Sequence, residues 1–486
     1  MNLEVISNSS NDKSKFTFTT DQQNAIDNII DFIGKPFNPA NYIVGLTGAG
    51  GTGKTFITRY IIAHCKYSSS VIKCTAPTHK ACRVFSQAIG GKKVETIQST
   101  FGLRLNLRLE DFDPEHPQFD PLSKVKLQNI KLLIIDEASM LPAKLVTFIC
   151  NKCKELNIKV LAMGDSSQLS PVNEHKSIAF DRCTKVNVLE EVVRQAAENP
   201  INDILTMLRH DIKYKTNDFL NYISNHNGDN VYNDKNEGYI ICKSNEFKEL
   251  INRSFTNEEY KSNIDMYRVI AYTNICISSW NNYIRNYIIP NARDNIITKN
   301  DLIMSYETIV NEFNEIVINN SEEYIINDIV NFVDTKYSFK GYLVRFQLVH
   351  GGNICDPLFI IDHKDRNSII TYNNTINELK ADAIKASGGL KASKWKQYYA
   401  FKKKYLIAAN IINRQGQILF SRDIDYGFAI TSHKSQGSTY DNVFVDVNDM
   451  VYTKEGIPYT DKDDMLRRLY VACSRARKQL VLCYGR

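Results

Sequence analysis

The chain has 486 residues, of which 43% are hydrophobic and 23% charged, so it has the composition of an ordinary globular protein and is too long for one hydrophobic core. Its formal net charge of +6 permits an anionic partner but does not prove one. No apolar run reaches membrane-spanning length, and the Asn- and Ser-rich residues 1–15 lack the apolar core of a signal peptide and are expected to form a disordered tail.

The first predicted helix begins near Thr20 or Asp21, either of which can act as its N-cap. Gln22 lies in its first turn, where the carboxamide could read the edge of an adenine base. This signal is weak alone, because exposed glutamines are common.

The stretch 48–55 reads GAGGTGKT and lies between an apolar run, 42–46, and an apolar-faced helical run, 56–62. A strand, a glycine-rich loop and a helix in this order form a phosphate cradle, because backbone N–H groups and the helix start face the anion. We expect Lys54 to reach the β- and γ-phosphates of ATP and the Thr55 hydroxyl to hold Mg²⁺. The predicted ATP-binding residues here are Gly48, Ala49, Gly50, Gly51, Thr52, Gly53, Lys54 and Thr55.

The next predicted strand, 71–75, ends before Pro77, which has no N–H for the ladder. Thr78, His79 and Lys80 then lie at the carboxyl end of a strand, where ligands bind in open α/β sheets. Lys80 by itself would equally suit a solvated lysine.

The segment 102–127 has no helical period, and its alternating leucines predict a strand that three prolines interrupt. We expect a hairpin that leaves the sheet, with Phe112 or Phe119 near its tip. An exposed aromatic ring there could wedge between bases, and an ordinary surface loop is the alternative.

Another buried strand, 131–135, ends in two acids. Asp136 should hold the magnesium, and Glu137 should orient or deprotonate the attacking water.

A third strand, 159–163, leads into a polar turn where Asp165 and Gln168 are placed to sense the γ-phosphate. The alternative is an ordinary polar turn without a role at the nucleotide. Arg194, after the apolar stretch that follows, proves nothing by itself.

The eleven cysteines are scattered and odd in number, which indicates a reducing compartment. Cys150 and Cys153 form a CxxC pair in a predicted helix, 143–156. No second CxxC or His pair lies nearby to complete a zinc site, so we expect both to pack in the core.

The second half predicts a further α/β layer structure, interrupted by about 296–418, where short β-type runs predict a small barrel. Within this insert, lysines over 391–405 are interleaved with Trp395, Tyr398, Tyr399 and Phe401. Such a segment suits single-stranded nucleic acid, with phosphates on the cations and bases on the rings. An amphipathic helix that packs its aromatics on the barrel is the alternative.

Taken in order, these stretches resemble the superfamily 1B DNA helicases, the group of the Dda-like and RecD-like enzymes, over most of the chain from Thr19 to Leu482. The motifs that carry the resemblance are 48–55 (I), 76–81 (Ia), 96–99 (Ib), 136–140 (II), 164–172 (III), Arg194 (IV), 431–438 (V) and 469–477 (VI). Gln98 and Ser170 depart from it, because the family often has His and Pro there.

The resemblance implies an α/β fold of two RecA-like parallel-sheet domains with ATP between them. The implied domains are 16–200 (1A, with the insertion 102–127 as a strand-separating pin), 201–295 with 419–486 (2A), and 296–418 (2B, an SH3-like β-barrel with an extended arm). Arg194 and Arg475 would reach the γ-phosphate, and Gly437 would join the nucleotide site. The implied DNA contacts are Pro77, Thr78, His79, Lys80, Gln98, Ser99, Asn274, His433, Lys434, Trp395 and Tyr399.

The implied function is that of an ATP- and Mg²⁺-dependent DNA helicase that moves 5′ to 3′ on single-stranded DNA and unwinds fork DNA. The process it serves is expected to be replication, recombination or repair. The protein is expected to be a cytoplasmic monomer of viral or phage source. Single-strand-binding and replication proteins are the expected partners. The alternative is an ATP-dependent strand-binding subunit of a larger recombination complex, without unwinding of its own. An ATPase acting on protein lacks support, and RNA in place of DNA stays open because a 2′-OH contact is not visible in a sequence.

Overall fold

The computed structural model describes residues 18–103, 125–171, 174, 177–191, 198–310, 316–349, 351–352, 354–412 and 418–485. Arg194, Phe112, Phe119 and the expected N-terminal tail lie outside these residues, as does most of the expected pin. None of the described helices is long and apolar enough to cross a membrane.

The first lobe is built on a six-stranded sheet with the order β3-β2-β4-β5-β1-β6, in which every pair is parallel. Its strands are β1 (Ile43–Gly48), β2 (Ile72–Ala76), β3 (Val94–Thr96), β4 (Leu132–Ile135), β5 (Lys159–Gly164) and β6 (Lys185–Leu189). β1, β4 and β5 are buried along their whole length, because helices cover both faces of the sheet.

The helices of this lobe are α1 (Thr20–Gly34), α2 (Lys54–His64), α3 (His79–Ala88), α4 (Ile97–Phe101) and α5 (Ala143–Glu155), with short 3₁₀ turns at Ser69–Val71 and Ala138–Met140. One core cluster joins α1, α2 and α3 to the sheet, and another joins α4 and α5 to it. Cys150 and Cys153 belong to the second cluster, which confirms their predicted place in the core. The N-cap of α1 is Thr19 rather than Thr20 or Asp21.

The second lobe repeats this plan with the strand order β20-β9-β21-β22-β8-β7, parallel except for β7. Its strands are β7 (Asn230–Tyr232), β8 (Gly238–Cys242), β9 (Tyr267–Ala271), β20 (Ala429–Thr431), β21 (Tyr440–Asp446) and β22 (Ala476–Cys483). Its helices are α7 (Ile201–Tyr214), α8 (Asp218–Asn225), α9 (Ser244–Phe255), α10 (Glu258–Ser262), α11 (Asn274–Ile288), α14 (Ser432–Ser435), α15 (Val447–Val451) and α16 (Lys462–Cys473), with a 3₁₀ turn at Ile264–Met266.

The insert between β9 and β20 contains a third sheet, in the order β16-β15-β14-β13-β10-β19. Its strands are β10 (Leu302–Ser305), β13 (Glu323–Val333), β14 (Lys340–Leu348), β15 (Leu358–Ile361), β16 (Tyr405–Leu406) and β19 (Ile424–Tyr426), beside the ribbons β11 (Ile309–Val310) with β12 (Ile316–Ile318) and β17 (Ile411–Ile412) with β18 (Ile418–Phe420). A bridge between Ala408, two residues past β16, and Ile424 of β19 brings the two edges of the sheet together, as a small barrel requires. β19, assigned by the sequence analysis to the second lobe, pairs with β10 in the insert.

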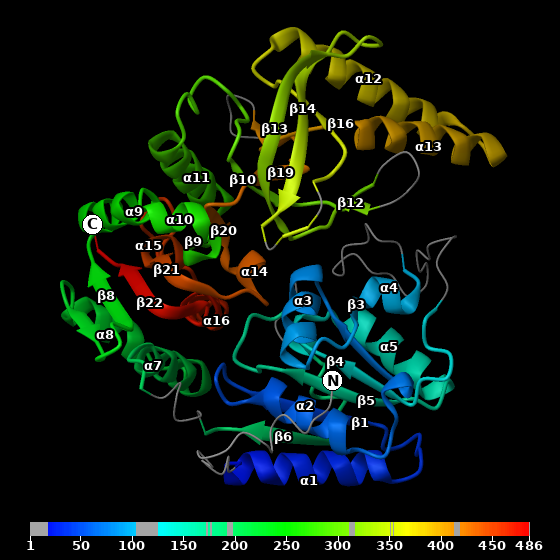
Figure 1. Ribbon diagram of the computed structural model, residues 1–486, viewed down its shortest axis with the longest axis vertical. Helices are drawn as coiled ribbons and strands as arrows, with labels where there is room; N and C mark the ends of the chain where they lie inside the picture. The colour runs from blue at the N-terminus through cyan, green and yellow to red at the C-terminus, as the bar shows by residue number, and fades with distance from the viewer. Residues whose placement is uncertain are drawn as a thin grey trace, which may run out of the picture.

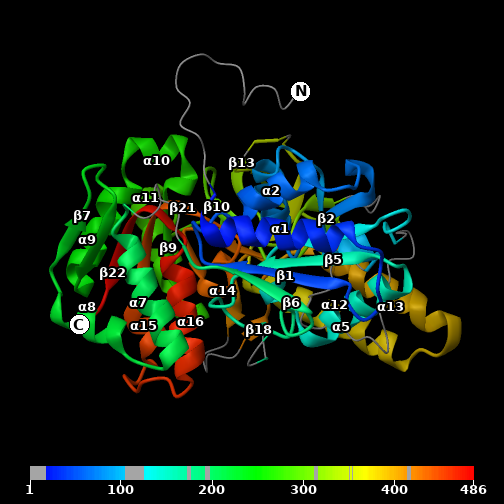
Figure 2. The same ribbon diagram turned by 90° about the horizontal axis from the view of Figure 1, so that it is seen from below.

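Two long helices, α12 (Arg366–Lys385) and α13 (Gly388–Lys404), leave the insert as an antiparallel pair. Figures 1 and 2 both show them projecting on the side away from the second lobe. The two lobes lie side by side, and the insert lies beside both of them (Figure 1). This arrangement brings the carboxyl edge of the first sheet against the amino ends of β9 and β21 and one turn of the insert. Lys80, just after β2, contacts Tyr440 at the start of β21 and Glu323 of the insert, and Glu323 also pairs with Arg268 of β9.

Candidate active site

Three groups of candidate residues meet at one edge of the first sheet. Because β1, β4 and β5 are parallel, their carboxyl ends lie on the same side. The phosphate loop follows β1, the acids Asp136 and Glu137 follow β4, and Asp165 with Gln168 follows β5. The backbone N–H of Ser166 donates to the Thr47 hydroxyl over 3.2 Å, which ties the loop after β5 to the end of β1.

The phosphate loop has the backbone shape that its glycines predict. Gly51 and Gly53 have φ of 80° and 84°, and Gly53 is the N-cap of α2. A Cβ on Gly48 would lie 2.7 Å from the Thr52 hydroxyl and 2.8 Å from the Leu189 carbonyl oxygen, so only glycine fits there. The Lys54 ammonium donates to the carbonyls of Gly48 and Ala49 over 2.5 and 2.9 Å, which places it over the loop.

The Gln22 side chain is buried and connects α1 to the phosphate loop. Its Nε2 donates to the Thr52 carbonyl over 2.9 Å, and its Oε1 accepts the Thr19 backbone N–H over 3.1 Å as half of a capping box. One N–H of the carboxamide remains for an adenine acceptor. Gln22 therefore holds the loop in place, a role that the sequence analysis did not foresee.

Asp136 and Glu137 lie in a partly buried pocket, where burial raises their pKa values and nearby cations lower them. Burial and then the charge of Glu137 raise the pKa of Asp136 to about 7, although the Lys54 ammonium opposes this shift. Burial also raises the pKa of Glu137, against the opposing charges of Arg475 and then Lys54. Glu137 itself has a left-handed backbone with φ of 50°, the kind of conformation that concentrates at functional sites.

The donor set fits a hard divalent cation and a water molecule. Thr55, in the first turn of α2, and Asp136 supply the oxygen ligands that Mg²⁺ prefers, and a cation would favour the ionised form of Asp136. Oε2 of Glu137 and Oε1 of Gln168 are buried atoms for which the described residues supply no hydrogen-bond partner. The Gln168 carboxamide lies close enough to hydrogen bond to the Glu137 carboxyl and oppose its pKa rise. Two acceptors side by side suit an attacking water.

Arg475 comes to this pocket from the second lobe. It follows α16, is buried, and donates from Nε to the Val471 carbonyl over 2.9 Å and from Nη1 to the Ser438 carbonyl over 3.2 Å. Its charge is the largest influence that lowers the pKa of Glu137, so the guanidinium lies within electrostatic reach of an acid of the first lobe. The second lobe also contacts the site directly, because the Tyr470 hydroxyl of α16 donates to Asp165 in the loop after β5 over 2.6 Å.

Gly437 lies against the first lobe. It has φ of 71°, and a Cβ there would lie 3.3 Å from the Cβ of Ala81 in α3. The described contact of Gly437 is thus with the first lobe's α3. Its neighbour Ser438 is the residue that accepts from Arg475.

Two of the expected DNA contacts are buried. Pro77 lies under the surface, and Lys80 is 5% exposed, with its ammonium 2.6 Å from Glu323 Oε2 of the insert and 3.2 Å from the Tyr440 hydroxyl. The alternative of a solvated Lys80 is wrong, because α3 packs against the insert and the second lobe. Burial alone would lower the pKa of Lys80, but the charge of Glu323 raises it, so Lys80 stays charged.

The other residues expected to contact single-stranded DNA from the two lobes are at least partly exposed, at the carboxyl edges of both sheets. They are Thr78 and His79 after β2, Gln98 and Ser99 in α4, Asn274 after β9, and His433 and Lys434 in α14. Lys434 donates to Ser321 and Asn320 of the insert over 2.9 and 3.2 Å. The insert thus contacts residues on both lobes.

The aromatic residues of α13 divide into two sets. Phe401 is buried in a cluster with Phe339 and Tyr372, and Tyr398 packs partly against the same cluster. Tyr399 is 52% exposed, and its ring lies 5.8 Å from that of the half-buried Trp395. The packing alternative is therefore confirmed for Phe401, whereas Trp395 and Tyr399 keep ring surface for a ligand.

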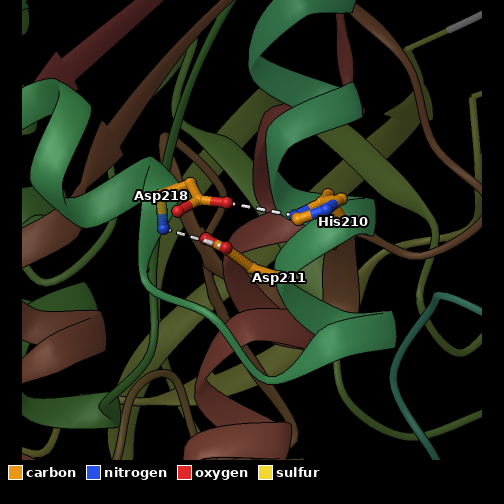
Figure 3. A group of neighbouring side chains, drawn as sticks. All are labelled: His210, Asp211 and Asp218. Atoms are coloured by element: carbon orange, nitrogen blue, oxygen red, sulfur yellow. Dashed lines mark hydrogen bonds and ion pairs between the residues drawn. The ribbon is translucent and has the colours of Figure 1, made fainter.

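His210, Asp211 and Asp218 lie together where α7 leads into α8 (Figure 3). Asp211 accepts the backbone N–H groups of Asp218 and Phe219, each over 2.9 Å, and His210 Nδ1 lies 3.0 Å from Asp218. The Asp211 oxygens are occupied in fixing the start of α8, which accounts for the cluster without a metal.

Sequence reasoning missed the residues that hold the two lobes and the insert together. These are Arg467 and Tyr470 of α16, Arg268 of β9, and Glu322 and Glu323 of the insert. Only Tyr470 and Arg475 share a motif in the sequence. The acids of the insert carry no local pattern that would mark them.

Comparison with known proteins gives two family matches. Residues 19–224 match the family described as AAA domain, and residues 426–483 match the UvrD-like helicase C-terminal domain. An uncharacterized protein of Acanthamoeba polyphaga mimivirus is 24% identical over 522 residues, covering 95% of this chain and 99% of that protein. The ATP-dependent DNA helicase dda of Enterobacteria phage T4 is 26% identical over 481 residues, covering 93% of this chain and 96% of that protein. The solved structure of the Bacteroides Pif1 helicase in complex with ADP-AlF3 and ssDNA is 16% identical, with a TM-score of 0.48, and the match covers 96% of this chain and 92% of that one.

Proposed function

The chain belongs to superfamily 1B of the helicases, in the group of Dda and Pif1, and we propose that it couples ATP hydrolysis to 5′-to-3′ movement on single-stranded DNA and to unwinding of duplex DNA. The observation that carries the proposal is the position of Arg475, whose charge from one lobe acts on Glu137 of the other. An arginine supplied across a cleft changes phosphoryl-transfer rates by about 10³–10⁵. Closing the cleft and hydrolysing ATP therefore become one event.

In this mechanism Lys54 exchanges the carbonyls of Gly48 and Ala49 for the β- and γ-phosphates. Thr55 and Asp136 would hold Mg²⁺, which neutralises phosphate charge when bound. Glu137 and Gln168 orient the attacking water, and Glu137 accepts its proton. Arg475, with Arg194 as a second arginine, offsets the charge that develops on the γ-phosphate.

Residues on both lobes would bind single-stranded DNA, so that closing and opening of the cleft between the lobes moves the protein along the DNA. Thr78, His79, Gln98 and Ser99 would grip the strand from the first lobe, and the contacts after β9 and β20 would grip it from the second. Residues 296–418 are proposed to be an SH3-like domain whose arm is the α12–α13 pair, and the segment 102–127 a separating pin with Phe112 or Phe119 at its tip. The working form is proposed to be a cytoplasmic monomer at fork DNA, in keeping with its eleven free cysteines.

The test compares duplexes that carry a single-stranded tail at either the 5′ or the 3′ end. We expect ATP turnover to rise strongly with oligothymidylate, and the 5′-tailed duplex alone to be unwound. Lys54→Ala should lose about two orders of magnitude in turnover or more, while it keeps strand binding. Turnover that is indifferent to DNA would refute the motor. DNA-stimulated turnover without unwinding of either duplex would instead indicate a strand-binding subunit.

A further inference from the structure

The loop after β5 is held from the opposite lobe by two side chains of α16. The Tyr470 hydroxyl donates to Asp165 Oδ2 over 2.6 Å. Arg467 Nη1 donates to the Ser166 carbonyl over 2.7 Å and to the Gln168 carbonyl over 3.0 Å. Three polar groups of one short loop thus depend on a helix that belongs to the other lobe.

These contacts fix the backbone that carries Gln168. Asp165 Oδ1 accepts the Ser167 N–H over 2.9 Å, and the Asp165 carbonyl accepts the Gln168 N–H over 3.2 Å. Asp165 therefore folds the loop with one carboxylate oxygen and receives Tyr470 with the other. Tyr470 is 0% exposed and Asp165 4% exposed, so water does not compete for this hydrogen bond.

The same helix also determines where Arg475 lies. α16 ends at Cys473, and Arg475 donates back to the Val471 carbonyl of its last turn over 2.9 Å. Arg467 is further oriented by Asp463, four residues before it, over 2.7 Å. A single rigid element therefore carries the arginine and the two side chains that hold the Gln168 loop.

We propose that Tyr470 and Arg467 are positioning residues, which place the Gln168 carboxamide beside Glu137 only while the second lobe stands against the first. Opening the cleft withdraws α16, and the loop then loses three hydrogen bonds at once. Closure of the lobes therefore places two groups at the same time: the Gln168 carboxamide, which orients the attacking water, and the Arg475 guanidinium, which offsets the charge on the γ-phosphate. This inference rests on the proposed ATPase motor and adds the residues that synchronise its two halves.

The experiment measures steady-state ATP turnover, with and without oligothymidylate, for Tyr470→Phe, Arg467→Ala and Arg467→Lys. Because the phosphate loop is untouched, we expect kcat with DNA to fall about tenfold for Tyr470→Phe and Arg467→Ala, with the KM for ATP unchanged within about twofold. Arg467→Lys should recover part of the loss, since a lysine retains a donor. Tyr452→Phe is the matched control, because among the described residues its hydroxyl hydrogen bonds to Tyr484, at 3.1 Å, within the second lobe.

A double variant separates positioning from a loss of folding. Asp165→Ala combined with Tyr470→Phe should lose no more kcat than Asp165→Ala alone, because the Tyr470 hydroxyl then has no carboxylate left to contact. Additive losses, a raised KM for ATP with kcat unchanged, or Tyr470→Phe equal to the wild type would each overturn the inference while the motor stands. A wild-type enzyme whose turnover ignores DNA would overturn both proposals.

Discussion

The carboxyl groups of Asp136 and Glu137 are two acids whose ionisation the folded site opposes. Burial opposes the ionisation of both acids, and the charge of Glu137 adds to this effect at Asp136. Lys54 acts in the opposite direction on both acids, and Arg475 and the Gln168 carboxamide do so on Glu137. Without a nucleotide this arrangement is unfavourable. A bound metal and phosphate would relieve it, so the pocket is prepared for a cation between the acids and the phosphate loop.

The first prediction concerns pH and Asp136→Asn. The pKa of Asp136 is raised from 3.8 to about 7, so between these values the folded state holds a proton that the unfolded state has lost. Stability of the metal-free protein should therefore fall as pH rises across this window. Asp136→Asn cannot ionise, and its melting temperature should fall less between pH 4 and 7 than that of the wild type. If the melting temperatures of the two proteins fell equally between pH 4 and 7, the raised pKa of Asp136 would be wrong.

At the scale of elements, α13 divides one aromatic run between a packed side and an exposed side. Phe401 faces the insert's core, whereas Tyr399 faces solvent beside Trp395. The helix is thus anchored by one side and presents rings and lysines on the other. α13 is one of the two projecting helices, so its exposed side lies outside the two lobes (Figure 1).

The second prediction follows from this division. Trp395→Ala and Tyr399→Ala should weaken binding of a labelled oligothymidylate more than Lys396→Ala does, by about 1–3 kcal/mol per lost stacking contact, as measured by fluorescence anisotropy. Phe401→Ala should instead cost about 3–5 kcal/mol of stability through the cavity it leaves. If Lys396→Ala weakened binding as much as the ring variants, the stacking role would be wrong.

At the scale of the whole molecule, three parts of the chain meet at one buried carboxylate. Glu323 of the insert lies 2.6 Å from Lys80 of the first lobe and 3.0 Å from Arg268 of the second. Both cations act to lower its pKa to about 2, against the effect of burial. Nearby, Arg83 donates to both oxygens of Glu322 at 2.7 Å. The relative placement of the lobes and the insert depends on these pairs.

The third prediction concerns this junction. Glu323→Gln leaves Lys80 and Arg268 buried without their counter-charge, so we expect a loss of about 3–5 kcal/mol, measured by denaturant unfolding. Asp31→Asn is the control, because the Asp31–Lys35 pair is more than half exposed and should contribute at most about 1 kcal/mol. Equal stability of Glu323→Gln and the wild type would mean that the junction does not hold the domains.

The sequence by itself determined the parts of the site that depend on neighbouring residues. The phosphate loop follows from a strand, a run of glycines and a helix start, and the acids after β4 follow from a buried strand that ends at the sheet's edge. Backbone shape and strand ends are local properties, so these positions could be predicted from spacing. The core places of Cys150 and Cys153 followed from their position in a predicted helix, with no second CxxC or His pair nearby to complete a zinc site.

Only the tertiary structure decided which side chains meet across the lobes. Burial of Pro77 and Lys80, the contact of Gly437 with α3, the pairing of β19 with the insert and the hold of Tyr470 on Asp165 all join residues that are distant in the chain. Charge and hydropathy at one position do not reveal the partner that arrives from another domain. A lysine that could bind a phosphate is therefore indistinguishable, in sequence, from one that binds a buried glutamate.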